Sequence, residues 1–248
     1  MRFDLHIHSC LSPCANLEMS PSEIVKRAVA AGMGGIALTD HQSARNTPAI
    51  AECARRAGLE CLFGLEVCTA EEVHTLAVFD TTEQALAMTE WVYEALPKRV
   101  NDPDTFGDQP VVTWDDDIVE MEWRILAMAC RRTIPETAAK CKELGGAYIA
   151  AHIDRPNFSV YSQLGCIPEG CFDAVELSRP EVTREQSPAV PRTSNGRMDE
   201  EKRYSGSRCQ QTSSTELMLA DSCLTTLQTH IFRKPPLIHL FTWCHLGT

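Results

Sequence analysis

The sequence contains no Cys-x-x-Cys pair, although it has twelve cysteines. Scattered thiols behind an N-terminus without an export signal predict a cytoplasmic protein with reduced cysteines rather than a disulfide framework. No apolar run reaches the length of a membrane-spanning helix, so we expect no membrane association. The chain also lacks a Gly-x-Ser-x-Gly motif and a P-loop, which argues against a serine hydrolase or a P-loop nucleotide hydrolase.

Positive charge is scarce. There are 23 Lys and Arg residues against 34 Asp and Glu, for a net charge of -11. This balance argues against a surface that coats nucleic acid, although it allows a local basic pocket, and it suits a protein that concentrates divalent cations. With 248 residues and 44% hydrophobic residues, the chain can form one large α/β domain or two small ones.

The first strand carries two histidines on one side. Residues 2–8 alternate apolar and polar side chains, which predicts a strand with two different faces. His6 and His8 then project together, close enough to bind one divalent cation. A half-buried strand with two hydrogen-bonded histidines is the other interpretation. Cys10 and Cys14 flank the loop that follows. They can be metal ligands, redox-sensitive neighbours of the histidines or residues that pack the loop, and packing is the favoured interpretation.

Strand-like segments alternate with helix-like segments over the first 180 residues. The sequence predicts strands at 35–38, 59–63, 73–79, 148–151 and 174–177, and helices at 20–32, 47–57, 82–96, 115–131 and from 133 onwards. Strands and helices joined by short loops favour parallel βαβ units. Because at least six strand candidates precede Ser178, a closed or distorted barrel is favoured over a small open sheet.

Six possible metal ligands lie at the edges of predicted strands: His6, His8, His41, Glu66, His74 and His152. The carboxyl ends of barrel strands meet in one cavity, so these residues can converge. His74 begins its strand, which therefore can run opposite to its neighbours. Imidazoles with a carboxylate suit Zn²⁺, Mn²⁺ or Fe²⁺, and so many ligands predict two or three cations with Glu66 bridging. Unrelated structural histidines are the alternative, but each then needs a separate explanation.

Four segments together resemble the PHP (polymerase and histidinol phosphatase) family over roughly residues 1–180. They are Asp4-Leu5-His6-Ile7-His8-Ser9, Leu38-Thr39-Asp40-His41, Gly64-Leu65-Glu66-Val67 and Ala151-His152-Ile153-Asp154-Arg155-Pro156. The resemblance implies a distorted (β/α)7 barrel with a trinuclear metal centre that hydrolyses phosphoesters, and it implies that the same six residues are the ligands. There are two departures. Some members have a histidine after His-x-His, where this chain has Ser12, Pro13 or Cys14, and no late Asp-x-His follows His152.

Metal-assisted hydrolysis of a phosphoester is the first functional hypothesis. In it, Asp40 orients an imidazole and Arg155 holds a phosphate group. A salt bridge to Asp154 or another neighbour is an equal alternative for Arg155. A metal-binding structural or regulatory module without turnover is the second hypothesis, because the late Asp-x-His is missing. Small phosphorylated metabolites, nucleotides and oligonucleotides all remain possible substrates.

The tail differs from the rest of the chain. Residues 187–214 are rich in Ser, Arg, Pro and Gly, with almost no apolar periodicity. We therefore expect a metal-dependent phosphoesterase domain at 1–180 and an irregular tail at 181–248, with the barrel incomplete at its C-terminal edge.

We predict that this tail is a frameshifted translation. Joining the last base of each codon to the first two of the next, from Leu217 to Ile231, permits Asp-Ala-x-Arg-Phe-Met-Leu-Asp-Asp-Ile-Ala-Asn-Ala-Tyr. That reading resembles the family's Asp-Ala-His and following Asp-Ile, although the genetic code does not permit His at the x position. Resequencing the gene between the codons for Ser178 and Leu217 should reveal the shift. An intact frame with a protease-resistant tail would contradict it.

Overall fold

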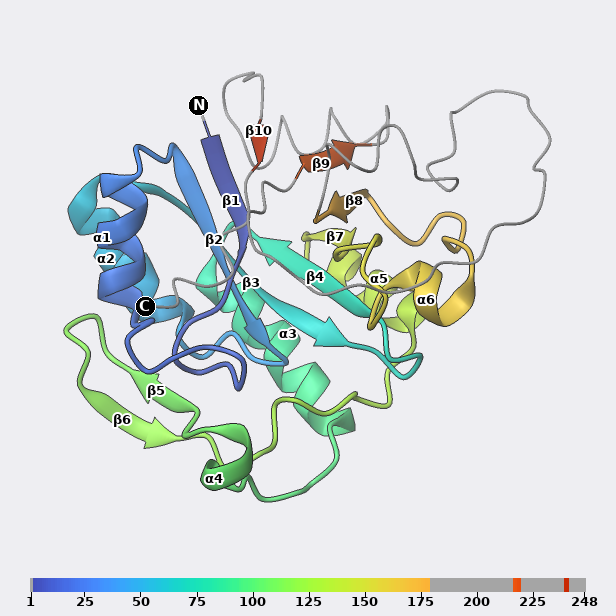
Figure 1. Cartoon of the computed structure of the whole chain (residues 1–248), viewed down its shortest axis with the longest axis horizontal. Helices are drawn as coiled ribbons and strands as arrows, with labels where there is room; N and C mark the ends of the chain where they lie inside the picture. The colour runs from blue at the N-terminus through green and yellow to red at the C-terminus, as the bar shows by residue number, and fades with distance from the viewer. Residues whose placement is uncertain (1, 179–215, 220–238, 241–248) are drawn as a thin grey trace.

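The central element is a curled sheet of eight strands. The computed structural model describes residues 2–178, 216–219 and 239–240, so the predicted irregular tail and its frameshift lie almost wholly outside the described residues. The strands are β1 (Arg2–Ile7), β2 (Gly35–His41), β3 (Glu60–Cys68), β4 (His74–Phe79), β7 (Ala147–Ala150), β8 (Ala174–Leu177), β9 (Glu216–Leu219) and β10 (His239–Leu240). Their order is β10-β1-β2-β3-β4-β7-β8-β9 (Figure 1).

Strand direction changes at β4. Strands β1, β2 and β3 are parallel, whereas β4 is antiparallel to both of its neighbours, β3 and β7. The expected reversal of the strand that begins with His74 is therefore confirmed. As a result, β4 begins at the same edge of the sheet at which the parallel strands end, which brings His74 to the side chains that follow β1 and β7.

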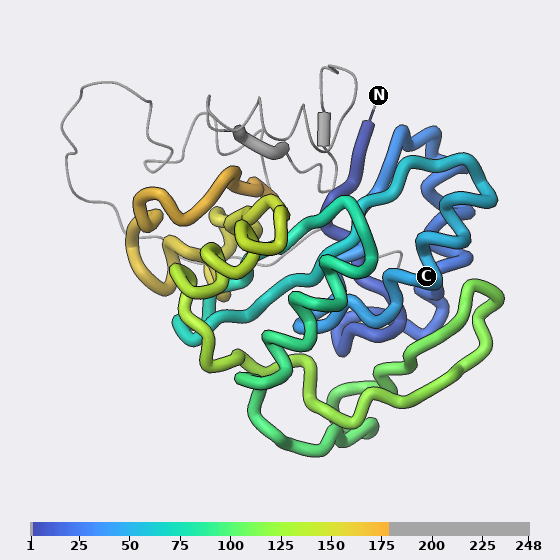
Figure 2. Tube along the Cα trace, turned by 180° about the vertical axis from the view of Figure 1, so that it is seen from behind, coloured from blue at the N-terminus to red at the C-terminus, as the bar shows by residue number. Residues whose placement is uncertain are grey.

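Helices cover the outer face of the sheet (Figures 1 and 2). They are α1 (Pro21–Ala30), α2 (Thr47–Ala57), α3 (Thr82–Ala95), α5 (Ile134–Glu143) and the short α6 (Val160–Leu164). Side-chain oxygens of Ser20 and Thr133 cap α1 and α5, and Thr81 and Gln84 form a capping box on α3. These caps bind backbone N–H groups that have no partner within the helix.

The buried apolar residues form three clusters. One packs β1 and β2 against α1 and α2, and a second packs β3, β4 and β7 against α3 and α5. The third contains no helix residue: its members, among them Phe3, Leu76 and Ile149, lie in strands or, for Ala151, directly after β7, so it fills the concave face of the sheet. The chain thus has an α/β fold with a curled, half-barrel sheet. The predicted seven-fold repeat of strand and helix is not confirmed.

A β-bulge in β1 turns the two histidines inward. Asp4 pairs with Ile36 and Ile7 with Leu38, so β1 has one more residue than β2 over this stretch. Leu5 lies in the concave cluster and Ile7 in the cluster with α1 and α2. Bulges re-aim side chains next to functional sites. Here the bulge places His6 on the concave face next to Leu5, and normal alternation then places His8 there too.

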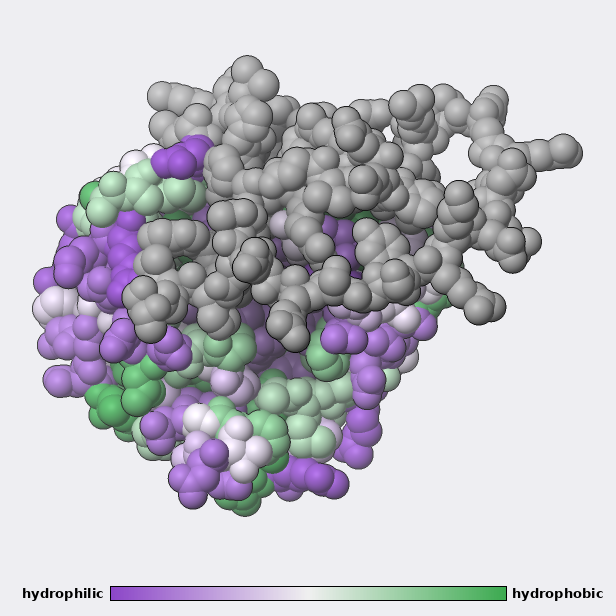
Figure 3. Space-filling model, in the orientation of Figure 1, coloured by the Kyte–Doolittle hydropathy of each residue, from purple (hydrophilic) through white to green (hydrophobic). Residues whose placement is uncertain are grey.

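The helix predicted over residues 115–131 was wrong. The second strand of a hairpin of β5 (Pro110–Val112) and β6 (Ile118–Met121) lies in the first part of this range, residues 122–131 form neither a helix nor a named strand, and the loop before β5 contains the short helix α4 (Pro103–Phe106). Ile118 and Val119 are β-branched and exposed, and they provide no buried helical stripe. Figure 3 shows apolar surface in the region of this hairpin. The helix was predicted because this range begins with Asp115 and ends with Arg131, and such a charge pattern is a weak helix signal without apolar periodicity.

The structure also bears on the cysteines and on the expected lack of a membrane-spanning helix. The nine cysteines in the described part of the chain are thiols, with no disulfide between them. Within the same residues, no helix is both long and apolar enough to cross a membrane.

We predict that Gly64→Ala destabilises the protein. A Cβ atom at this position would overlap the carbonyl oxygen of Ala77, because β3 and β4 approach closely there. Overpacking of this kind costs about 1–3 kcal/mol. Chemical denaturation should show this loss, whereas Glu60→Ala, at an exposed position on the same strand, should change the free energy of unfolding little. Equal stability of the two variants would refute the close approach.

Candidate metal centre

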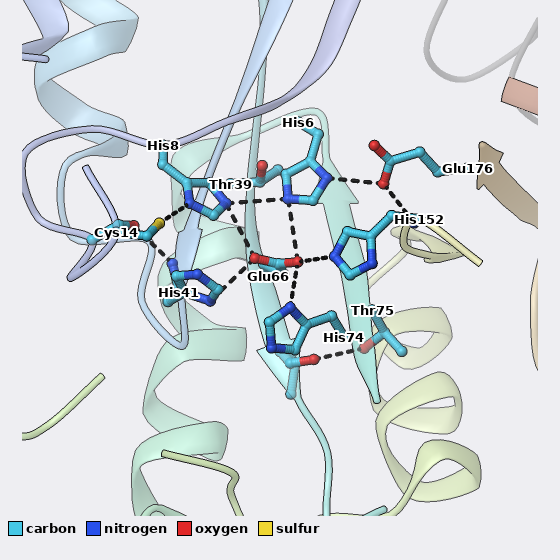
Figure 4. A network of polar contacts seen from close by, with 12 residues as sticks. His6, His8, Cys14, Thr39, His41, Glu66, His74, Thr75, His152 and Glu176 are labelled. Atoms are coloured by element: carbon cyan, nitrogen blue, oxygen red, sulfur yellow. Dashed lines mark hydrogen bonds and ion pairs between the residues drawn. The ribbon is translucent and has the colours of Figure 1, made fainter. Parts of the chain in front are cut away.

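Five imidazoles surround the buried carboxylate of Glu66 (Figure 4). The ring nitrogens near its Oε1 atom lie at 3.3, 2.9 and 3.1 Å, and they belong to His6, His74 and His152. The nitrogens near Oε2 both lie at 3.1 Å and belong to His8 and His41. The structure therefore brings together all six predicted ligands, in two groups that share one carboxylate.

The site suits divalent cations better than a hydrogen-bond network. Glu66 is only 1% exposed, and neither ring nitrogen beside its Oε2 atom forms a hydrogen bond with it, so this oxygen has no hydrogen-bond partner among the described residues. The Nδ1 atom of His152 is likewise buried without one. Buried polar atoms are normally satisfied, so unsatisfied atoms in a cluster of ligand side chains point to an ion. Three overlapping groups of side chains could each hold a metal ion, since the ligand atoms within each group lie within 4.8 Å of one another.

A carboxylate that the sequence analysis missed orients His6. The Oε2 atom of Glu176 accepts from Nδ1 of His6 at 2.9 Å and from the backbone N–H of His152 at 3.0 Å. With Nδ1 held in this way, Nε2 of His6 faces Glu66, which is the arrangement of a metal-binding imidazole with a supporting carboxylate. The available signal was a charged residue within the short buried strand predicted at 174–177.

The electrostatics of the centre depend on close pairing of opposite charges. Burial raises the pKa of Glu66, but the imidazoles of His74, His6 and His41 hold it well below its usual value. Burial lowers the pKa of His6, and the carboxylates of Glu176 and Glu66 outweigh this and raise it well above its usual value. Burial lowers the pKa of His41 well below its usual value, although the carboxylate of Glu66 opposes this effect. The centre thus places an anionic carboxylate among several imidazoles.

Asp40 anchors the loop that follows β1. Its carboxylate accepts hydrogen bonds from the backbone N–H of Ser9 at 2.6 Å, from the Ser9 hydroxyl at 2.7 Å and from the Ser12 hydroxyl at 2.6 Å. The Ser12 hydroxyl in turn accepts from the backbone N–H of His41 at 3.0 Å. Asp40 thereby fixes the loop against the end of β2. Its predicted action on an imidazole stays a prediction.

Arg155 lies beside the centre on the loop after β7. Its backbone N–H donates to the carbonyl of His152 at 2.9 Å, and its exposed side chain donates from Nε to the Ser178 hydroxyl at 3.1 Å. His152 itself has a positive φ of 29°, which is rare for a residue other than glycine. Such backbone strain is concentrated at functional sites, where the surrounding structure maintains it.

The fold and the site define an α/β protein with a carboxylate-centred, histidine-rich cluster able to bind metal at one edge of a curled sheet. The family model of the PHP domain matches residues 4–158, which is more than half of the chain. The protein belongs to the PHP family, and the resemblance noted in its sequence is confirmed.

Two curated relatives match the chain in part. A 3',5'-nucleoside bisphosphate phosphatase of Chromobacterium violaceum is 36% identical over 88 residues, covering 34% of this chain and 30% of that protein. A 5'-3' exoribonuclease of Haemophilus influenzae is 34% identical over 85 residues, covering 33% and 30%. The matched part of this chain therefore spans less than a third of either relative.

A solved structure shares the fold. The lesion-specific endonuclease Q of Pyrococcus furiosus superposes with a TM-score of 0.50 at 19% identity, covering 70% of this chain and 40% of that one. At this identity the likeness concerns the fold alone.

We predict that Glu176→Gln weakens metal binding. The neutral amide cannot support His6 as the carboxylate does, and loss of such an outer partner typically costs about 10–100-fold in affinity. Competition between the protein and a chromogenic chelator for Zn²⁺ measures the effect. Glu169→Gln, which changes an exposed residue, serves as the control and should bind Zn²⁺ as the unmodified protein does. Unchanged affinity in Glu176→Gln would exclude this supporting role.

Proposed function

We propose that this chain is a metal-dependent phosphoesterase whose centre holds two or three divalent cations. The observation that carries the proposal is the division of the imidazoles into one group at each oxygen of Glu66. A carboxylate that serves two ligand groups suits a bridging ligand. The ligand types suit Zn²⁺, Mn²⁺ or Fe²⁺, and the ligands are His6, His8, His41, Glu66, His74 and His152.

The chain contributes binding and orientation to the reaction. Cations bound there would supply Lewis acidity, which activates water and neutralises the charge of a phosphoryl group. Glu176 keeps Nε2 of His6 directed at Glu66, and Asp40 fixes the loop beside His41. The guanidinium of Arg155 is the proposed phosphate clamp, because it can bind two phosphate oxygens and lies three residues after His152.

The proposed substrates are nucleotides, oligonucleotides or small phosphorylated metabolites. Two relatives support the first two classes, since one is named a nucleoside bisphosphate phosphatase and the other an exoribonuclease. The finer fold prediction, a distorted seven-fold barrel that is incomplete at its C-terminal edge, belongs to the same proposal. The curled sheet supports it. The cytoplasmic location stays a prediction from the sequence.

A metal-binding module without turnover is the second candidate. It is favoured by one observation, the absence of a late Asp-x-His after His152. Such a module binds metal through the same imidazoles but releases no phosphate.

We expect His8→Ala and Glu66→Ala each to lower phosphoester hydrolysis at least about a thousandfold, since a lost cation removes several kcal/mol of transition-state stabilisation. A panel of nucleoside bisphosphates, short oligonucleotides and sugar phosphates, assayed with Mn²⁺ or Zn²⁺, measures this effect. Circular dichroism should show an intact fold, because both residues lie at the sheet edge rather than in an apolar cluster.

Glu60→Ala is the control for this experiment, because it removes an exposed carboxylate from the same strand as Glu66. It should retain full activity. If the unmodified protein binds metal but hydrolyses none of the panel, the module without turnover is the correct assignment. Full activity in His8→Ala or Glu66→Ala would overturn the metal centre itself.

A further inference from the structure

Cys14 completes a third group of ligand atoms at the outer side of the centre. Its Sγ atom lies 2.9 Å from Nδ1 of His8, and ligand atoms of Cys14, His8 and His41 all lie within 4.8 Å of one another (Figure 4). His8 presents its other nitrogen, Nε2, to Glu66 at 3.1 Å. The thiol therefore extends the cluster of imidazoles on the side of His8 and His41.

The neighbouring carboxylate oxygen provides an independent sign of an ion here. Oε2 of Glu66 faces His8 and His41, is fully buried, and has no hydrogen-bond partner among the described residues. A cation beside this oxygen would satisfy it and would lie next to both histidines of the Cys14 group. The unsatisfied atom and the thiol thus belong to the same part of the centre.

The loop holds Cys14 in place before any ion binds. The backbone N–H and hydroxyl of Ser9 and the hydroxyl of Ser12 donate to Asp40, and the backbone N–H of Ala15 donates to the carbonyl of Ser12 at 3.0 Å. These bonds tie both sides of Cys14 to the end of β2. A ligand fixed in this way loses little conformational freedom when it binds a metal.

We propose that Cys14 is a thiolate ligand of one cation of this centre, together with His41 and His8. When the S–metal bond forms, the thiol proton passes to solvent, and the thiolate adds a negative charge. That charge matters because Glu66 is the only carboxylate in the three ligand groups of the described residues, and buried cations need compensation. A thiolate also selects Zn²⁺ over Mn²⁺ or Mg²⁺ at this position.

This inference rests on the proposed metal centre but not on turnover, and it replaces the packing role that the sequence favoured for Cys14. The test loads the full chain with Co²⁺ in place of the native metal and records its absorption spectrum. A cysteine ligand gives a thiolate-to-cobalt charge-transfer band in the near ultraviolet. We expect this band in the unmodified protein and its loss in Cys14→Ser.

Two further variants make the result specific. Cys166→Ser changes another exposed cysteine and should keep the band. Cys14→His should lose the band yet keep the bound metal, because imidazole is also a ligand, whereas Cys14→Ala should bind Zn²⁺ at least about tenfold more weakly at this position. Zn²⁺ should also protect Cys14, but not Cys166, from alkylation by iodoacetamide, measured by peptide mass spectrometry.

The outcomes separate this inference from the proposed function. Cys14 is not a ligand if Co²⁺ binds but the unmodified protein shows no band, or if the band persists in Cys14→Ser. In either case the histidine centre still stands. Equal alkylation of Cys14 with and without Zn²⁺ overturns the inference in the same way. If the unmodified protein binds neither Co²⁺ nor Zn²⁺, both the inference and the metal centre fail.

Discussion

The charge of one buried carboxylate constrains the whole site. Glu66 stays ionised although it is almost inaccessible to solvent, because imidazoles surround both of its oxygens. An unpaired buried carboxylate would instead take up a proton, since burial strongly disfavours its charged form. The surrounding rings must therefore converge on one point from strands that lie far apart in the sequence.

The fold achieves this convergence with a few local devices. The bulge in β1 turns His6 and His8 to the concave face, and the reversed direction of β4 places His74 at the edge where the parallel strands end. Gly64 lets β4 approach β3 closely next to Glu66. The strained backbone of His152 brings in the last ring. Each device lies within two residues of a predicted ligand or involves one directly.

Apolar periodicity predicted most elements of the fold. Strands and helices with strong patterns were found where expected, including α3 and the reversed β4. The hairpin of β5 and β6 was missed, because a charge pattern was interpreted as a helix without an apolar stripe to support it.

The convergence of the six proposed ligands on one point followed from their places at strand edges, a rule that needs no coordinates. Glu176 was missed because its role depends on the register between β7 and β8, and strand pairing over long sequence distances cannot be deduced from local pattern. The contact of Cys14 with His8 likewise depends on how the loop folds over β2.

The central claim is that Glu66 bridges separate cations. Anomalous X-ray diffraction from crystals grown with Zn²⁺, recorded on both sides of the zinc absorption edge, locates each ion directly. We predict at least two peaks, one at each oxygen of Glu66, with His6, His74 and His152 around the first and His8 and His41 around the second. A single peak, or zinc bound away from Glu66, would contradict the account.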